Sequence, residues 1–151
     1  MPATRDPAHA DGDCALGFDF GTRLVGVAVG NRITGSASAL TSIANGDWPR
    51  FDALIAGWRP ARLIVGLPLA LDGGEQAASR GARAFAAALE NRYGLVVELV
   101  DERYSSAEAA RRFAARRATG GARRKDAHAI DALAAAVILE DWLARTPRRD
   151  T

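Results

Sequence analysis

The chain has 151 residues, enough for one domain with a core of its own, and its composition excludes several classes of protein. Hydrophobic residues make up 48% and charged residues 25%, as in an ordinary globular protein. Because Cys14 is the single cysteine, an intramolecular disulfide is excluded, and a buried thiol in a reducing compartment is expected. The first residues carry charges and prolines, and no apolar run approaches the roughly 20 residues of a membrane span. We therefore expect a cytoplasmic protein without a signal peptide.

The net charge of +2 says little, but the positive charge is concentrated in one segment. Between Arg103 and Lys125 there are eight basic residues and one acid, Glu108. Closely spaced like charges repel one another unless a polyanion screens them. The segment is therefore either a solvated helix face or a surface that contacts phosphate.

Both ends of the chain are predicted to be disordered tails, residues 1–12 and 146–151, around one domain that covers residues 13–145. That domain opens with short runs in which apolar residues alternate with small or polar ones, as is typical of strands. Tight turns separate these runs. We therefore predict a three-stranded meander, with strands at about residues 14–20, 24–30 and 33–42.

Beyond this meander, helices and strands alternate. One helix is predicted to end at Gly94, and another to begin with a capping box at Ser105. The predicted elements are helices at about residues 47–58, 78–93, 105–117 and 125–145, and strands at about 63–67 and 95–100. The order βββαβαβαα implies an α/β fold, with a mixed five-stranded sheet flanked by helices.

Asp19 lies inside the first predicted strand, where aspartate is disfavoured. Its side of the strand carries Gly17 instead of a bulky neighbour, which predicts open space around the carboxylate. A turn-capping aspartate before Gly21 is the alternative explanation.

Asp101 and Glu102 end the last predicted strand, where ligands approach in open α/β sheets. Because side chains alternate along a strand, the two acids point to opposite faces, and only one should serve a given site. The alternative is that these acids pair with Arg103 or stabilise the N-terminus of the following helix.

Asp131 lies on the last predicted helix, at the edge of the stripe that must face the sheet, in line with Ala135, Ile138 and Trp142. A carboxylate there needs a partner, either an arginine or a metal ion, because burying an unpaired charge is costly. Asp126 lies about 140° around the helix from it and is interpreted as a cap or first-turn acid.

Carboxylate oxygens without histidine or cysteine suit hard cations such as Mg²⁺ or Mn²⁺. One or two such ions would activate water and stabilise the leaving oxygen in phosphodiester cleavage. The three acids together therefore favour a metal-dependent hydrolase.

Four segments together resemble the YqgF/RuvX family, in the family's order: LGFDFGTRLVGVAVG, LIVGLPLALDG, VELVDERYSSAEA and RRKDAHAIDALAAAVILEDWL. They cover nearly everything between Ala15 and Leu143. The resemblance implies a ribonuclease H-like fold and a nuclease that matures the 5′ end of pre-16S rRNA in ribosome biogenesis. The same family is also described as Holliday junction resolvase-like.

On this resemblance the catalytic and metal-binding acids fall on Asp19, Glu102 and Asp131, which selects Glu102 over Asp101. The implied cofactor is Mg²⁺ or Mn²⁺. Ser105-Ser106 stand where the family often has two threonines, so that the hydroxyl groups are kept.

Arg23, Arg124 and Lys125 are the residues expected to bind nucleic acid. His128 is either an exposed residue of the helix or a proton shuttle. The expected partner is structured RNA, namely pre-16S rRNA, with branched DNA as the second possibility and no membrane. The expected oligomeric state is a monomer or a weak homodimer.

Two other functions fit parts of the sequence. Asp19-Phe20-Gly21-Thr22 also resembles the phosphate loop of the actin and sugar-kinase ATPases, but those proteins need a second lobe for which this chain is too short. A non-catalytic RNA-binding protein on a degenerate nuclease fold is the other, and the presence of all three acids counts against it. The sequence thus favours a nuclease that hydrolyses phosphodiester bonds.

Overall fold

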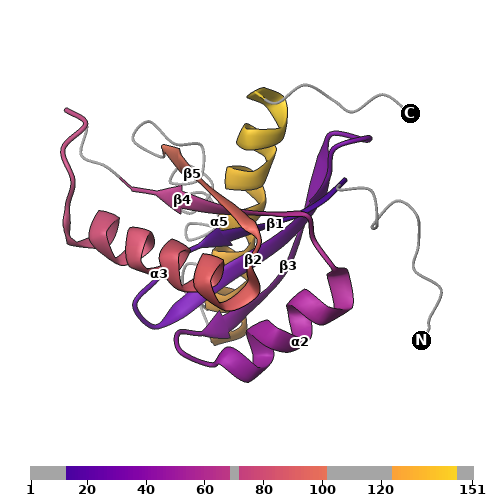
Figure 1. Ribbon diagram of the computed structural model, residues 1–151. Coiled ribbons are helices and arrows are strands. Elements are labelled where there is room, and N and C mark those ends of the chain that lie inside the picture. Colours follow the sequence, from indigo (N-terminus) through magenta and orange to yellow (C-terminus); the bar gives the residue numbers. More distant parts are fainter. Residues whose placement is uncertain (1–12, 69–71, 102–123, 146–151) are drawn as a thin grey trace.

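The computed structural model describes residues 13–68, 72–101 and 124–145, with only the backbone described for 124–129. These residues form a five-stranded sheet with α2 and α3 on one face and α5 on the other (Figure 1). The strands are β1 (Cys14–Asp19), β2 (Leu24–Asn31), β3 (Ser36–Ala44), β4 (Arg62–Leu67) and β5 (Val96–Asp101). The helices are α2 (Trp48–Trp58), α3 (Ala77–Tyr93) and α5 (Arg124–Arg145).

The strand order in the sheet is β3-β2-β1-β4-β5. The first three strands pair antiparallel, as the predicted meander requires, whereas β4 and β5 run parallel to β1. The predicted mixed five-stranded sheet is therefore confirmed. The predicted tails and the predicted helix over residues 105–117 lie outside the described residues.

One core lies between the sheet and the α2 and α3 helices. Phe18 of β1 is fully buried, and its ring centroid lies 6.2 Å from that of Phe51 in α2 and 5.7 Å from that of Phe85 in α3. Ala82 and Leu89 of α3 are also buried there, on the helix face that the apolar spacing predicted. This aromatic cluster fixes both helices against the same face of β1.

The second core lies under α5, on the other face. Ala135, Ile138 and Trp142 are buried in it, which confirms the predicted stripe. A Cβ atom added at Gly17 would lie 3.0 Å from Cβ of Leu139, so this glycine brings α5 close to β1. The space beside Gly17 is therefore filled by the helix, and the predicted opening around Asp19 does not come from this glycine.

Two strand boundaries differ from the prediction because of local turns. β3 begins at Ser36 instead of residue 33, because Asn31 Oδ1 accepts hydrogen bonds from the amides of Ile33 (2.7 Å) and Thr34 (3.2 Å) and holds the chain in a turn. β5 begins at Val96, after Gly94 has ended α3 in the left-handed conformation with φ of 66°. Among the described helices, none combines the length and apolarity of a membrane-spanning segment.

Candidate active site

Asp19 is the last residue of β1, and its side chain faces α5. Leu16 and Phe18 contact the core under α2 and α3, whereas Ala15 packs under α5, so the alternation along the strand assigns Asp19 to the α5 face. The residue is only 7% exposed. The Asp19 side chain, at the end of β1, therefore points toward the layer formed by α5.

Asp131 comes to the same place through a glycine on the neighbouring strand. Gly26 of β2 is the register partner of Asp19. A Cβ atom added at Gly26 would lie 1.9 Å from the carbonyl oxygen of Asp131 and 2.3 Å from its carbonyl carbon. Only glycine allows the α5 backbone to come this close to the sheet. The half-buried Asp131 is therefore fixed beside the strand position that faces Asp19.

The end of β5 shows which of two neighbouring acids can reach this face. Val100 is buried under α5, and Glu98 accepts a 3.1 Å hydrogen bond from Trp142 Nε1 of that helix. Val97, of the other parity, packs on the α3 side. Asp101 has the parity of Val97 and is exposed, so the structure places it on the face opposite α5. Glu102 lies outside the described residues.

Asp19 and Asp101 lie at the carboxyl ends of their strands, which is where ligand sites of open α/β sheets are usually found. β1, β4 and β5 run parallel, so their carboxyl ends lie at one edge of the sheet. Asp19 ends β1 at that edge, and Asp101 ends β5, in register with Leu67 of β4. Ligands of open α/β sheets bind at this edge.

The turn between β1 and β2, next to Asp19, carries Arg23. This residue is exposed, and its carbonyl oxygen accepts a 2.9 Å hydrogen bond from the amide of Asn45. Asn45 Nδ2 in turn donates to the carbonyl oxygen of Gly21 at 2.9 Å. The turn is thus tied at two points to the residue after β3, which leaves the Arg23 side chain at the surface.

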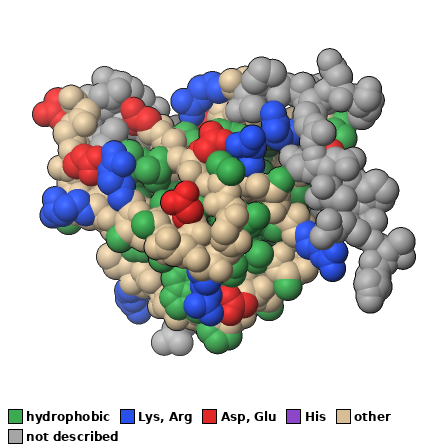
Figure 2. All heavy atoms as spheres, viewed as in Figure 1, with side chains coloured by type: hydrophobic (Ala, Val, Ile, Leu, Met, Phe, Trp, Pro, Cys, Tyr) green, Lys and Arg blue, Asp and Glu red, His purple; other side chains and the backbone are tan. Residues whose placement is uncertain are grey.

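The other predicted basic residues, Arg124 and Lys125, begin α5, and their side chains are outside the described part, as is that of His128. On the face seen in Figure 2, the coloured Lys and Arg side chains form separate small groups, several of them beside acids. Among the described residues, ion pairs join Arg83 to Glu75 and Arg92 to Asp52. The described residues on this face therefore do not form one continuous basic surface.

The donor set at the carboxyl edge is carboxylate oxygen, which suits Mg²⁺ or Mn²⁺. Of the three predicted acids, Asp19 is the register partner of Gly26, and the backbone of Asp131 packs against Gly26. No cluster of three or more histidine, cysteine, aspartate or glutamate residues with metal-binding spacing occurs among the residues that the structure describes. The structure therefore places the backbone of Asp131 near the strand position of Asp19, and the metal-binding role of these acids stays a prediction.

Sequence reasoning missed Gly26 and Asn45. Gly26 lies inside the strand Leu24–Asn31, and this position could have revealed its role, because a glycine within a strand indicates close approach of another backbone. Nothing in the spacing of Asn45 indicates that its side chain holds a turn 24 residues earlier in the chain.

With this geometry in place, comparison with known proteins identifies the family. The sequence profile of RuvX, described as a Holliday junction resolvase, matches residues 13–145. The chain belongs to the RuvX family.

Two relatives from Xanthomonas campestris pv. campestris (strain B100) and Xanthomonas axonopodis pv. citri (strain 306) are each 54% identical to the chain over 133 residues. The alignments cover 85% of this chain and 86% of each relative, and both relatives carry the provisional name pre-16S rRNA nuclease. A similar solved structure is T. thermophilus RuvC in complex with a Holliday junction substrate, with a TM-score of 0.51 and 14% identity. It covers 87% of this chain and 94% of that chain, and it confirms the ribonuclease H-like fold.

Proposed function

We propose that this protein is a divalent-metal-dependent nuclease that hydrolyses phosphodiester bonds in structured RNA and processes the 5′ end of pre-16S rRNA. Membership of the RuvX family and the name of its 54%-identical relatives support the reaction and the substrate. The single structural observation that carries the proposal is the contact of the Asp131 backbone with Gly26, directly opposite Asp19. This contact supports the proposal because it brings the backbone of Asp131 next to the strand position opposite Asp19.

Asp19, Glu102 and Asp131 are the residues that would hold Mg²⁺ or Mn²⁺. Glu102 is included because the family resemblance assigns it, and Asp101 is not, because its parity on β5 places it on the face opposite α5. A bound divalent cation would supply charge for the phosphate and activation of water. The contribution of the chain is to fix the backbone of the acids, because Asp19 belongs to β1 and the backbone of Asp131 packs against Gly26 of β2.

Arg23, Arg124 and Lys125 are proposed to bind RNA phosphates. Arg23 is exposed on a turn that follows Asp19 by four residues, so it can reach a phosphate next to the one that is cleaved. The affinity for RNA should then fall steeply as salt increases, because each phosphate contact releases counterions. A salt-independent affinity would remove these residues from the interface.

Cleavage of branched DNA is the second candidate function, because the family is described as a Holliday junction resolvase. The carboxylates at the sheet edge do not themselves distinguish RNA from DNA.

We further propose that the nuclease domain spans residues 13–145, that the protein acts in the cytoplasm, and that it is a monomer or a weak homodimer.

The decisive experiment incubates the purified protein with precursor rRNA and, separately, with a four-way DNA junction, each in the presence of Mn²⁺ or EDTA. We expect cleavage of the rRNA with Mn²⁺ and none with EDTA. Glu102→Gln should abolish this cleavage, whereas the matched control Asp101→Asn, one residue earlier and on the face of β5 opposite α5, should retain it. Cleavage of the junction alone would transfer the proposal to DNA, and equal activity of both variants would refute the role of Glu102.

A further inference from the structure

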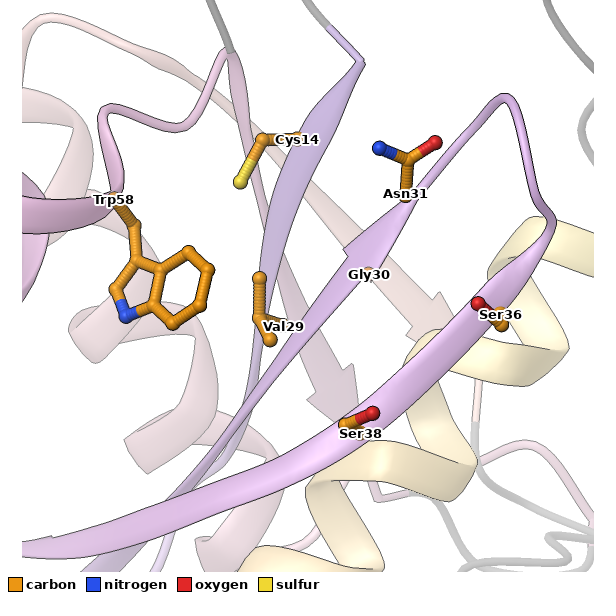
Figure 3. A pocket seen from close by; sticks show the side chains of 7 residues that line it. All are labelled: Cys14, Val29, Gly30, Asn31, Ser36, Ser38 and Trp58. Atoms are coloured by element: carbon orange, nitrogen blue, oxygen red, sulfur yellow. The ribbon is translucent and has the colours of Figure 1, made fainter. Parts of the chain in front are cut away.

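An open cavity of about 190 Å³ lies far from the carboxylates. Cys14, the first residue of β1, lines it, whereas Asp19 is the last residue of the same strand. With about 3.3 Å per residue, the two ends of β1 are about 17 Å apart. The cavity opens on the α2 side of the sheet, between the end of that helix and the β2–β3 hairpin (Figure 3).

The inner part of this cavity is apolar, and the flat indole ring of Trp58 forms one of its sides. Trp58, the last residue of α2, forms one wall, and Val29 of β2 lies across from it (Figure 3). Cys14 is 2% exposed, and burial raises the pKa of its thiol to about 11, so it contributes a neutral surface and no thiolate. The cavity therefore offers an indole ring and aliphatic neighbours to whatever enters.

The rim of the cavity is polar and uncharged. Asn31 Oδ1 accepts the amides of Ile33 and Thr34, which fixes the orientation of the side-chain amide and leaves Nδ2 on the cavity side (Figure 3). Ser36 and Ser38 of β3 add hydroxyl groups from the other side. The rim thus presents a fixed donor and the Ser38 hydroxyl, which can donate or accept, whereas the Ser36 hydroxyl already shares a 2.8 Å hydrogen bond with Thr34 Oγ1.

We infer that this cavity binds a single unstacked base of the RNA substrate, with the base against Trp58 and its polar edge toward Asn31 and Ser38. The inference rests on the proposed function for its choice of RNA. An aromatic wall with donors and acceptors at its rim is the usual way in which proteins hold a splayed base. The volume is below the 300–1,000 Å³ that is typical of drug-sized ligands, which favours one small planar group.

Arg59, next to the cavity, supplies a positive charge for the RNA phosphates attached to such a base. Arg59 follows Trp58, is exposed, and is fixed in the left-handed conformation with φ of 49° as the cap of α2. Among the residues that the structure describes, no charged side chain lines the cavity, so the charge of Arg59 lies outside the base-binding part. Because the cavity and the carboxylates lie on opposite faces of the sheet, a base held here positions the substrate without touching the cleaved bond.

The test fills the cavity with a larger side chain and compares RNA binding with that of a variant in which the neighbouring residue carries the same side chain. Ser38→Leu places an apolar side chain in the cavity, and Ala39→Leu places one at the next exposed position of β3, outside it. Affinity for a fluorescent fragment of precursor rRNA is measured by anisotropy, and cleavage is followed over a range of substrate concentrations. Ser38→Val is a second, smaller filler suited to a strand. Thermal unfolding of each variant verifies that it is folded.

We expect Ser38→Leu to weaken RNA binding about tenfold, in the range found when base stacking is removed, and to raise KM with little change in kcat. Ala39→Leu should bind as the unmodified protein does. Equal affinities of the two leucine variants, or a loss in kcat alone, would overturn the inference. The proposed function fails separately, if the unmodified protein binds the RNA and does not cleave it in Mn²⁺.

Discussion

Gly26→Ala is the substitution by which the geometry of the candidate active site is best tested. The added methyl group would lie 1.9 Å from the carbonyl oxygen of Asp131, whereas ordinary contact begins at 3.4 Å. The α5 backbone must therefore retreat by about 1.5 Å, or β2 must move by as much. Neither side can yield by rotating a side chain, because the clash is between a Cβ atom and main-chain atoms.

The expected effect has two parts. Forcing an extra carbon into a packed interface costs about 1–3 kcal/mol, which lowers the Tm of a domain of this size by about 3–10 °C. A displacement of about 1 Å in a catalytic group costs about 100-fold in rate. We therefore expect Gly26→Ala to be folded under assay conditions and to lose about two orders of magnitude in kcat, because Asp131 no longer lies beside Asp19.

Two other glycines provide matched controls. Gly57→Ala in α2 meets nothing within 4 Å and should stabilise the protein slightly, with full activity. Gly30→Ala on β2 meets the side-chain end of Leu139 at 2.9 Å, so it should lower the Tm through packing while the cleavage rate stays within a few-fold. Thermal unfolding and single-turnover cleavage are measured on all three variants.

The reasoning is refuted if Gly26→Ala cleaves as fast as Gly30→Ala at the same loss of Tm. That result would mean that Asp131 does not need its present position for catalysis. A Gly26→Ala protein with an unchanged Tm would contradict the close contact itself.

Three further predictions concern stability and reactivity. Phe51→Ala removes a ring that is 1% exposed and should lower the free energy of unfolding by about 3–5 kcal/mol in urea titration; a loss below 1 kcal/mol would contradict its place in the core. The Arg92 guanidinium and the Tyr93 hydroxyl lower the pKa of Asp52 from 3.8 to about 2, so the stability from this carboxylate is present above pH 3.8 and is lost as the pH falls toward 2. Asp52→Asn should therefore lower the Tm at pH 6 and much less at pH 2, and equal losses at both would refute the coupling. Cys14 should react slowly with a thiol reagent at pH 8, because its pKa is raised to about 11 by burial; rapid reaction of the folded protein would contradict this.

The order of the elements could be predicted from the sequence because the apolar residues of each strand and helix follow the faces that are buried. The apolar run Leu63–Leu67 predicted a strand buried on both faces, and β4 is indeed the inner parallel strand. The stripe through Ala135, Ile138 and Trp142 predicted which side of α5 meets the sheet. In both cases the arrangement of apolar residues along the chain, a continuous run or a helical stripe, reports burial directly.

The features that sequence reasoning missed depend on contacts between distant segments. The start of β3 was predicted three residues too early, because the hydrogen bonds of Asn31 Oδ1 to two later amides do not alter the apolar pattern. The role of Gly26 depends on the backbone of Asp131, which is 105 residues later in the chain. Alternation on β5 separates Asp101 from the α5 face, as the sequence reasoning expected for one of the two acids, whereas the roles of Glu102, Arg124 and Lys125 stay predictions.

The central claim is that Asp19 and Asp131, together with Glu102, hold a shared divalent cation. It is tested most directly by Mn²⁺ titration calorimetry on a double-mutant cycle of Asp19→Asn and Asp131→Asn, with Asp141→Asn on the same helix as the control. Ligands of one ion are coupled, so each single variant should lose most of the affinity, and the double variant should lose little more. The control should bind Mn²⁺ as the unmodified protein does. Additive losses, or an unchanged affinity in either single variant, would contradict a shared metal site.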